Sequence, residues 1–393
     1  MRIALVSQAY PPETGGGGIS TQTHAKAHGM ASLGHDVHVI SHSPDASRHH
    51  TWDGDVSVIR IPGGDARLAI HTEPVRWLTY SVEVAVAVAE LHSRAPLDLV
   101  DFPEYGAEGY VHLLNQAEWN HVRSAVQLHG PLVMLAHTVG WPEIDSDFYR
   151  TGVALEGACV RLADAVYSSS RCSVDWCAQY YGLDPERVPI LHTGVDTVLF
   201  RPLGLAQDPR PTIVFVGKLV ANKGVETLVA AACRLAGEFP DLRVRLIGSG
   251  EADMADRLQT QAARAGLPKL IDWPGFVEHA QLPEHLCQAH VFAAPSMYEG
   301  GPGFVYLEAM ACGLPVIACA GSGAAEAIRD GETGLLVPPG DVEGLAQALR
   351  RLISDTDERE TMGRRAREHV LAEADSRTCI RRVEAFYKSV VQG

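Results

Sequence analysis

The sequence predicts an α/β protein made of two doubly wound, Rossmann-like domains. Short apolar runs alternate with helix-forming segments along nearly the whole chain, which is typical of parallel strands covered by helices on both faces. A polar, proline-containing run that reaches residue 211 interrupts this alternation. The length of 393 residues is enough for two domains of ordinary size. We therefore predict one domain over residues 1–200, a second over residues 201–375, and a final helix within residues 376–393.

The first domain opens with a strand, a glycine-rich loop, a helix and a second strand. We predict the strands at residues 3–6 and 37–40 and the helix at residues 19–33, while residues 15–18 are four consecutive glycines. The same order begins a dinucleotide-binding domain, so a dinucleotide-dependent oxidoreductase is an alternative.

The dinucleotide fingerprint, however, has features that this loop lacks. It places G-x-G-x-x-G directly after the first strand and an acidic residue at the end of the second. Here eight residues separate Val6 from Gly15, and Ser41-His42-Ser43 follows the second strand. The residues therefore favour a ligand loop of another kind.

The rest of the first domain continues the alternation of strands and helices. We predict strands at residues 56–61, 97–102, 122–128, 163–170 and 188–191, and helices at 75–91 and 174–181. His129 comes directly after one of these strands. Because ligands of open α/β sheets bind at the carboxyl ends of the strands, we expect His129 at a binding site.

The second domain repeats the pattern, and its first loop carries two cations. Lys218 and Lys223 lie between a predicted strand at 212–216 and a helix at 225–235. Point charges beside a helix N-terminus suit a diphosphate. Strands are predicted at 244–247, 271–277, 291–294 and within 331–339, and helices at 282–289, 304–311, from 321, 342–353, 358–371 and 376–390.

Two glutamates flank the loop between the strand at 291–294 and the helix at 304–311. Glu299 is in the loop, and residues 300–303 (GGPG) place almost no side chains over their backbone amides. Glu308 lies about one turn into the helix, where a buried carboxylate needs a hydrogen-bond donor. Two adjacent ribose hydroxyls would supply it.

These residues resemble the donor-site signature of retaining glycosyltransferases with the GT-B fold, in particular glycosyltransferase family four. In that family the first glutamate contacts the transferred sugar and the second holds the nucleotide ribose. Eight residues lie between Glu299 and Glu308, where the family normally has seven. The segment GKLVANKG also resembles the family's G-R-L…K-G pattern, with Lys218 where Arg is usual. Residues 191–202 (LHTGVDTVLFRP) resemble its interdomain segment, with Thr193 in the usual Asn place.

The resemblance implies a role for each matched residue. His129 would lie beneath the transferred sugar and contact a hydroxyl, and the nucleobase would lie against the strand and turn at 271–277. The implied donor site comprises Gly16, Gly17, Gly18, Lys218, Lys223, Val277, Gly301, Gly303, Phe304, Val305 and Glu308. Catalytic roles are implied for His129, Glu299, Lys218 and Lys223. In this fold the two domains face each other across a cleft and the final helix crosses back to the first domain.

The implied reaction is glycosyl transfer with retention of configuration. A hexosyl or N-acetylhexosaminyl group would move from a UDP- or GDP-sugar to a hydroxyl of a small-molecule, saccharide or lipid-linked acceptor. The nucleotide sugar is then a co-substrate, and we expect no cofactor. The alternative of another class is a non-catalytic protein that binds nucleotide sugars.

The charge distribution limits which kinds of molecule the protein is expected to bind. The formal net charge of −15 argues against nucleic-acid binding. Residues 1–200 hold 12 Lys and Arg against 23 Asp and Glu, a balance of −11, which favours a neutral or cationic acceptor. The acidic residues that we expect to line the acceptor site are Glu104, Glu108, Glu143, Asp145 and Asp147.

Composition also bounds the compartment and the metal chemistry. No apolar run reaches the roughly 18 residues of a membrane span, so we expect no stable membrane insertion. The eight cysteines include no C-x-x-C pair, which favours reduced thiols in the cytoplasm. Two D-x-D triplets, at 53–55 and 145–147, do not follow apolar strands, so we expect no metal site.

Overall fold

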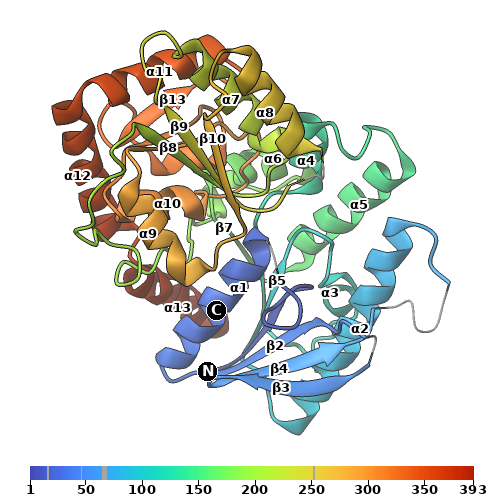
Figure 1. The fold of residues 1–393 in the computed structure, drawn as a ribbon. Coiled ribbons are helices and arrows are strands. Elements are labelled where there is room, and N and C mark those ends of the chain that lie inside the picture. The colour runs from blue at the N-terminus through green and yellow to red at the C-terminus, as the bar shows by residue number, and fades with distance from the viewer. Residues whose placement is uncertain (16, 46, 64–68, 251–252) are drawn as a thin grey trace. The chain divides into compact units, whose positions relative to one another are not determined.

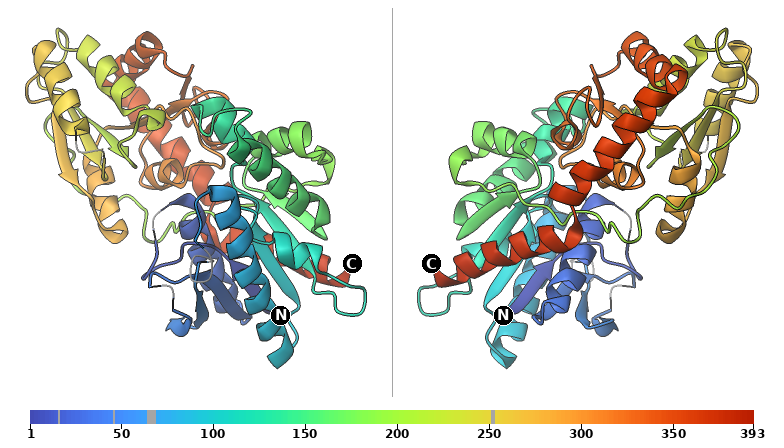
Figure 2. Two further views of the ribbon diagram at one scale, coloured as in Figure 1. Left: turned by 90° about the vertical axis from the view of Figure 1, so that its right-hand side faces the viewer. Right: turned by 90° about the vertical axis from the view of Figure 1, so that its left-hand side faces the viewer.

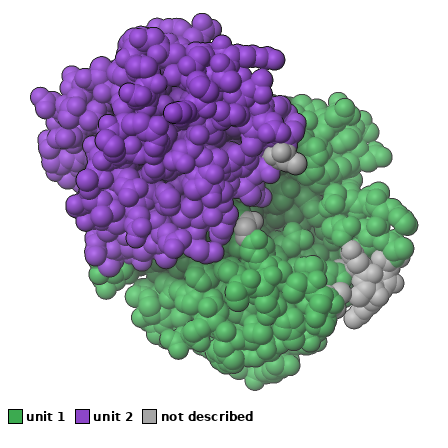
Figure 3. Space-filling view, viewed as in Figure 1, with its two compact units in different colours: residues 1–193, 377–393 green, residues 194–376 purple. Residues whose placement is uncertain are grey.

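The computed structural model describes residues 1–393 except 16, 46, 64–68 and 251–252, and it shows an α/β chain with two parallel-sheet units (Figure 1). Unit 1 comprises Met1–Thr193 and Arg377–Gly393, and unit 2 comprises Gly194–Ser376 (Figure 3). The division lies before the predicted residue 200 because the start of the linking segment packs on unit 2. The Val195 N–H donates to the Ala374 carbonyl at 2.8 Å, and Phe200 is buried in the core of unit 2.

Unit 1 is built on a seven-stranded sheet with the order β3-β4-β2-β1-β5-β6-β7. All neighbouring strands are parallel except β3 and β4, which form an antiparallel edge. The sequence does not predict β3, because its residues HHTWD lack an apolar run. The strands are β1 (Arg2–Val6), β2 (Asp36–His42), β3 (His49–Asp53), β4 (Val56–Ile61), β5 (Leu99–Pro103), β6 (Ser124–Leu128) and β7 (Ala165–Ser168).

The helices of unit 1 include the last one of the chain. They are α1 (Gly18–Ser32), α2 (Glu73–Arg94), α3 (Tyr110–Leu114), α4 (Leu132–Val139), α5 (Asp147–Leu162), α6 (Arg171–Tyr181) and α13 (Ser376–Gln392). Ile380, Val383 and Tyr387 of α13 are buried in the core of this unit, and Figure 2 shows the helix in red. A Cβ at Gly29 would lie 2.7 Å from Cγ1 of Ile380, so only glycine lets α1 approach α13 this closely.

Unit 2 is built on a six-stranded, fully parallel sheet with the order β10-β9-β8-β11-β12-β13. Its strands are β8 (Thr212–Val216), β9 (Arg243–Ile247), β10 (Ile271–Gly275), β11 (Val291–Ala294), β12 (Val316–Cys319) and β13 (Gly334–Val337). Its α-helices are α7 (Val225–Arg234), α8 (Met254–Arg264), α9 (Leu282–Gln288), α10 (Phe304–Ala311), α11 (Val342–Ser354) and α12 (Thr356–Glu373). A large hydrophobic cluster of described residues packs against the sheet.

The structure corrects several predicted elements. The strand expected at 188–191 is only an isolated bridge between Ser168 and Ile190. The helix expected from residue 321 is a short 3₁₀ turn, η5 (Gly323–Ala327). The helices α3, α4, α5 and α8 were not predicted, because the sequence analysis followed the apolar runs that mark strands.

The parallel strands bring the loops that matter for function to one edge of each sheet. In unit 1 the carboxyl ends of β1, β5 and β6 are adjacent, and in unit 2 those of β8, β9, β11 and β12. Ligands of such sheets bind at this edge. Among the described residues, we find no helix with both the length and the apolar composition needed to cross a bilayer.

Candidate active site

In unit 2 the structure brings together two residues that lie far apart in the sequence, Lys223 and Glu299. The Lys223 ammonium donates to the Glu299 carboxylate at 2.6 Å, and the side chains are 28% and 18% exposed. Lys223 ends the 3₁₀ turn η3 (Ala221–Lys223) after β8, and Glu299 is in the loop after β11. The pair therefore stands at the carboxyl edge of the sheet.

Gly224 is the reason that these two loops meet. It has a φ of 72°, and a Cβ on it would lie 2.1 Å from the carbonyl oxygen of Pro295 at the end of β11. The Met297 N–H donates to the Asn222 carbonyl at 2.9 Å and joins the loops directly. A side chain at Gly224 would push the loops apart and separate Lys223 from Glu299.

The glycine-rich loop after Glu299 packs against the segment that leads into η5. The Gly323 N–H donates to the Glu299 carbonyl at 2.8 Å, and a Cβ on Gly323 would lie 2.6 Å from the Gly301 carbonyl oxygen. Gly303 has a φ of 61° and stands at the N-cap of α10. The loop thus delivers Gly301, Gly303, Phe304 and Val305, all partly exposed, to the positive end of a helix dipole.

Glu308 lies one turn into α10 and is 6% exposed. Its Oε1 is 2.8 Å from Nε2 of His279, whose side chain is 56% exposed. Burial raises the pKa of Glu308 and the contact with His279 opposes this rise, while the hydrogen bond to Glu308 raises the pKa of His279. His279 was not predicted from the sequence, because residue spacing alone does not reveal that the turn after β10 reaches α10.

The two remaining residues of unit 2 that are predicted for the donor site, Lys218 and Val277, follow the carboxyl ends of β8 and β10. Lys218 is exposed, directly after Gly217, which has a φ of 153°. Val277 packs against the hydrophobic core beyond β10, next to Phe276, which is 72% exposed. A partly buried aliphatic side chain and an exposed ring provide an apolar surface that suits a planar base.

In unit 1, His129 follows β6 at the carboxyl edge of the sheet. Its Nδ1 is buried and has no hydrogen-bond partner among the described residues. Burial, and secondarily the charge of Lys26, holds the pKa of His129 well below its usual range, so the ring is neutral at neutral pH. Buried polar atoms are normally hydrogen-bonded, so this nitrogen is suited to a ligand hydroxyl or a water.

Three glutamates of unit 1 accept hydrogen bonds from backbone N–H groups and do not line an open surface. Glu104 accepts from the N–H groups of His129 and Gly130 at 2.6 and 2.5 Å, and Glu156 accepts from Leu132 at 2.9 Å. Glu108 accepts from Gln8 at 3.1 Å. Burial raises the pKa of Glu104 to about 7 and those of Glu108 and Glu156 to about 8.

These contacts correct one expectation of the sequence analysis. Glu104 is 0% and Glu108 5% exposed, so neither of them lines an open acceptor surface. Glu143, Asp145 and Asp147 are exposed, at the start of α5 and just before it. Their exposure is compatible with the expected acceptor site, which stays a prediction.

The glycine-rich loop of unit 1 leads into α1. Gly17 has a φ of 133° and forms the N-cap of this helix, and Gly18 is its first residue. A Cβ on either residue would meet no other atom within 4 Å, so the space beside them is open. Gly16 lies outside the described residues.

The sequence analysis also missed a buried polar network below this loop. Lys26 of α1 is 3% exposed and contacts the Asp101 carboxylate, Gln127 Oε1 at 2.6 Å and the Tyr167 hydroxyl at 2.8 Å. The Tyr387 hydroxyl of α13 donates to Asp101 at 2.6 Å. This network ties α1 and α13 to three strands of the sheet, and its members are spread from residue 26 to residue 387.

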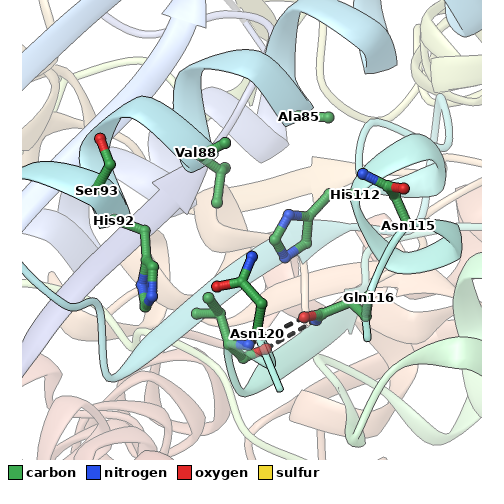
Figure 4. Close-up of a pocket in the computed structure, with 10 residues that line it drawn as sticks. Ala85, Val88, His92, Ser93, His112, Asn115, Gln116 and Asn120 are labelled. Atoms are coloured by element: carbon green, nitrogen blue, oxygen red, sulfur yellow. Dashed lines mark hydrogen bonds between the residues drawn. The ribbon is translucent and has the colours of Figure 1, made fainter. Parts of the chain in front are cut away.

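A cavity of about 220 Å³ lies elsewhere in unit 1 (Figure 4). It is lined by Ala85, Val88, Ala89, His92, Ser93, His112, Asn115, Gln116, Asn120 and Val122. Val122 precedes β6 and His92 lies in the last turn of α2, so the cavity is at the amino ends of the strands. Because ligands of such sheets bind at the opposite ends, the cavity is not part of the candidate site.

Solved structures share the fold of this chain over nearly its whole length. Sucrose-phosphate synthase from Thermosynechococcus elongatus superposes with a TM-score of 0.82 at 25% identity, over 99% of this chain and 98% of that one. The complex of Anabaena Alr3699/HepE with UDP-glucose has a TM-score of 0.75 at 19% identity, over 99% and 100% of the two chains. The fold thus places the protein in the class of proteins with the GT-B fold.

The sequence comparisons give the family. The model of glycosyl transferases group 1 matches residues 200–369, and that of the glycosyl transferase 4-like domain matches residues 17–194. The alpha-maltose-1-phosphate synthase of Mycolicibacterium smegmatis is 31% identical over 95% of each chain. The glycogen synthase of Mycobacterium tuberculosis (strain ATCC 25618 / H37Rv) is 27% identical over 100% of this chain and 96% of its own. The chain belongs to glycosyltransferase family four, which confirms the resemblance and leaves no support for a dinucleotide-dependent oxidoreductase.

Proposed function

We propose that this glycosyltransferase moves a hexosyl or N-acetylhexosaminyl group from a UDP- or GDP-sugar to an acceptor hydroxyl with retention of configuration. The observation that carries the proposal is the grouping of Lys223, Glu299 and the start of α10 at one edge of the sheet of unit 2. A cation, a carboxylate and a helix N-terminus match the diphosphate and hydroxyls of such a donor. The UDP-glucose complex of Alr3699/HepE supports a nucleotide sugar as the donor class.

In the proposed mechanism the leaving diphosphate is stabilised by Lys218 and Lys223 without a metal. Preorganised positive charge at the place where negative charge develops is a large catalytic term. The ion pair with Glu299 fixes the Lys223 ammonium before the donor arrives, which reduces the cost of reorganisation. Glu299 has a second oxygen that can accept from a hydroxyl of the sugar.

Glu308 is proposed to hold the nucleotide ribose. In the free protein its Oε1 already has His279 as a partner, so a ribose would share Glu308 with the imidazole or replace it. Either exchange keeps the buried carboxylate hydrogen-bonded.

Unit 1 is proposed to contribute His129 and the acceptor. A neutral imidazole with an unpartnered buried Nδ1 can exchange a hydrogen bond with a sugar hydroxyl, and it is not required as a nucleophile. We propose that the leaving phosphate accepts the proton of the acceptor hydroxyl.

For the acceptor we propose a neutral or cationic molecule, with Glu143, Asp145 and Asp147 as the exposed acidic residues near it. The relatives named as glycogen synthase and alpha-maltose-1-phosphate synthase favour a saccharide among the acceptor classes. We further propose that the protein is cytoplasmic, since its eight cysteines are free thiols. We also propose that it needs no cofactor, does not bind nucleic acid and does not insert into a membrane.

The test is a thermal-shift screen of UDP- and GDP-sugars with the full chain, followed by mass spectrometry of acceptor mixtures. We expect one donor to raise the melting temperature and a product one glycosyl unit heavier than its acceptor. NMR of the new anomeric proton would then report whether the configuration is retained. Binding of a donor with neither transfer nor slow hydrolysis would instead support a non-catalytic nucleotide-sugar-binding protein.

A further inference from the structure

A second group of ligand-type side chains lies in unit 1, between α1 and the end of β3. Nε2 of His28 is 2.8 Å and Nε2 of His24 is 3.2 Å from the same oxygen, Oδ2 of Asp53. One ligand atom from each of the three residues lies within 4.8 Å of the others. The side chains are 41%, 37% and 26% exposed for His24, His28 and Asp53, so solvent reaches the group.

Local structure accounts for this convergence. His24 and His28 are four residues apart in α1, so their side chains are neighbours on one face, with ring centroids 4.4 Å apart. Asp53 ends β3 and precedes Gly54, which has a φ of 57° and turns the chain into β4. The tight turn directs the strand end toward the face of α1 that carries both histidines.

We propose that His24, His28 and Asp53 form a binding site for Zn²⁺ or a similar divalent transition metal. Two imidazoles and one carboxylate are a ligand set that zinc uses, with one coordination position left for water. Ligand atoms about 2.0–2.1 Å from a tetrahedral ion lie about 3.4 Å from one another. The two separations from Asp53, 3.2 and 2.8 Å, are close to this value, and the third, between the two histidines, is within 4.8 Å.

Tyr10 provides the outer support that such a site needs. Its hydroxyl donates to Oδ2 of Asp53 at 3.0 Å, so it orients the carboxylate from the side of the loop after β1. Hydrogen bonds of this kind to a ligating carboxylate usually strengthen metal binding. A bound ion would therefore fasten α1, the β3 edge and the loop before the glycine-rich stretch to one another.

The proposed zinc site departs from the expectation, made from the sequence, that the protein has no metal site. The proposal concerns unit 1 and leaves the donor site of unit 2 without a metal. In the sequence, Asp53 stands out only as part of the D-x-D triplet 53–55, where its partner would be Asp55. The tertiary structure instead pairs Asp53 with two histidines that precede it by 25 and 29 residues. The proposal uses none of the residues assigned to donor binding, so it stands or falls independently of the proposed transfer reaction.

The experiment is equilibrium dialysis of the full-length, untagged and chelator-treated chain against Zn²⁺, with metal analysis of the protein. We expect one Zn²⁺ per chain. His28→Gln and Asp53→Asn should each weaken binding at least about tenfold, as should Tyr10→Phe, which keeps all three ligands and tests the site if a ligand variant misfolds. Zn²⁺ should raise the melting temperature of the native chain and not that of His28→Gln.

His121→Gln is the matched control. His121 is also a histidine of unit 1 paired with a carboxylate, Asp164, at 2.9 Å, but among the described residues it belongs to no group of three potential metal ligands. We expect this variant to bind Zn²⁺ like the native chain. Absence of stoichiometric Zn²⁺ from the native chain, or equal Zn²⁺ binding by His28→Gln, Asp53→Asn and His121→Gln, would show that the histidines are only hydrogen-bond partners of Asp53 and would overturn the proposal.

Discussion

Acidic residues follow the strands at the carboxyl edge of both sheets, and they serve different purposes in the two units. In unit 2, Glu299 is partly exposed and pairs with the ammonium of Lys223. In unit 1, Glu104 follows β5 and is fully buried, and its Oε1 accepts hydrogen bonds from two backbone N–H groups. A carboxylate after a parallel strand is therefore partly accessible to solvent in one unit, whereas in the other it is buried and fixes the backbone of a neighbouring loop.

The difference shows what a charge count can and cannot say. The balance of −11 over residues 1–200 includes Glu104, Glu108 and Glu156. A pKa of about 7 leaves Glu104 about half protonated near neutral pH, and pKa values of about 8 leave Glu108 and Glu156 mostly protonated. The negative field that an acceptor would meet is accordingly smaller than the count suggests. The comparison predicts that changing carboxylates in unit 1 mainly alters stability, whereas changing charges at the edge of unit 2 mainly alters activity.

The largest expected effect is on the buried network of unit 1. Asp101→Ala should lower the free energy of unfolding by about 3–5 kcal/mol, because it leaves the Lys26 ammonium buried without its partner. Urea denaturation followed by tryptophan fluorescence suits this test, since five of the six tryptophans lie in unit 1. Glu90→Ala, which breaks the exposed pair with Arg48, is the control and should cost less than about 1 kcal/mol. A similar loss in both variants would contradict a structural role for the network.

The next effect concerns activity in unit 2. Lys223→Ala should cost about 2–4 kcal/mol of transition-state stabilisation, or about 30- to 1000-fold in kcat/KM, with a nearly unchanged melting temperature. Steady-state kinetics with the identified donor measure it. Lys269→Ala is the matched control, since Lys269 is exposed and precedes the amino end of β10. A loss below about threefold in Lys223→Ala would reject the diphosphate role.

A smaller effect is expected at Glu308. Glu308→Gln removes the charge that would bind the ribose, so the affinity for UDP or GDP should fall by about 1.5–3 kcal/mol, or about 10- to 150-fold. Calorimetric titration of both nucleotides measures this, with the exposed Glu284 of α9 changed to Gln as a control. Unchanged affinity would mean that Glu308 serves only to hold His279.

The last effect is gradual, because it is the pH dependence of the stability of unit 1. Burial raises the pKa of Glu108 from 4.5 to about 8, so the folded state binds its proton more tightly than the unfolded state. Stability from this group is thus present below pH 4.5 and is lost as the pH rises to about 8, by at most about 1.4 kcal/mol per pH unit.

Glu108→Gln removes this titration and keeps an oxygen for the Gln8 N–H. The stability of the variant relative to the native chain should therefore increase between pH 5 and pH 8 in urea denaturation. Glu118→Gln, at an exposed position of the same unit, should show no such trend. Parallel pH profiles for all three proteins would mean that Glu108 is ionised in the folded state.

The residue pattern alone was enough to predict the α/β class and the elements of unit 2 that flank its ligand loops. The predicted helix at 304–311 and the strands at 212–216 and 291–294 coincide with α10, β8 and β11. These elements are marked by local signals, namely buried apolar runs, a glycine stretch before a helix and a Gly-Leu-Pro end after it. Local signals of this kind do not depend on distant contacts.

Contacts between segments that are distant in the sequence could be identified only in the tertiary structure. The Lys223–Glu299 pair depends on the absence of a side chain at Gly224, the His279–Glu308 pair on the turn after β10, and the His24–His28–Asp53 group on the β3 edge. The sequence by itself determined the α/β alternation and those strands, helices and glycine-rich loops that carry strong local signals, because these follow from periodicity and from residues with special backbone preferences. Whether a given carboxylate faces solvent or a backbone N–H was decided only by packing, since burial depends on neighbours that are remote in the chain.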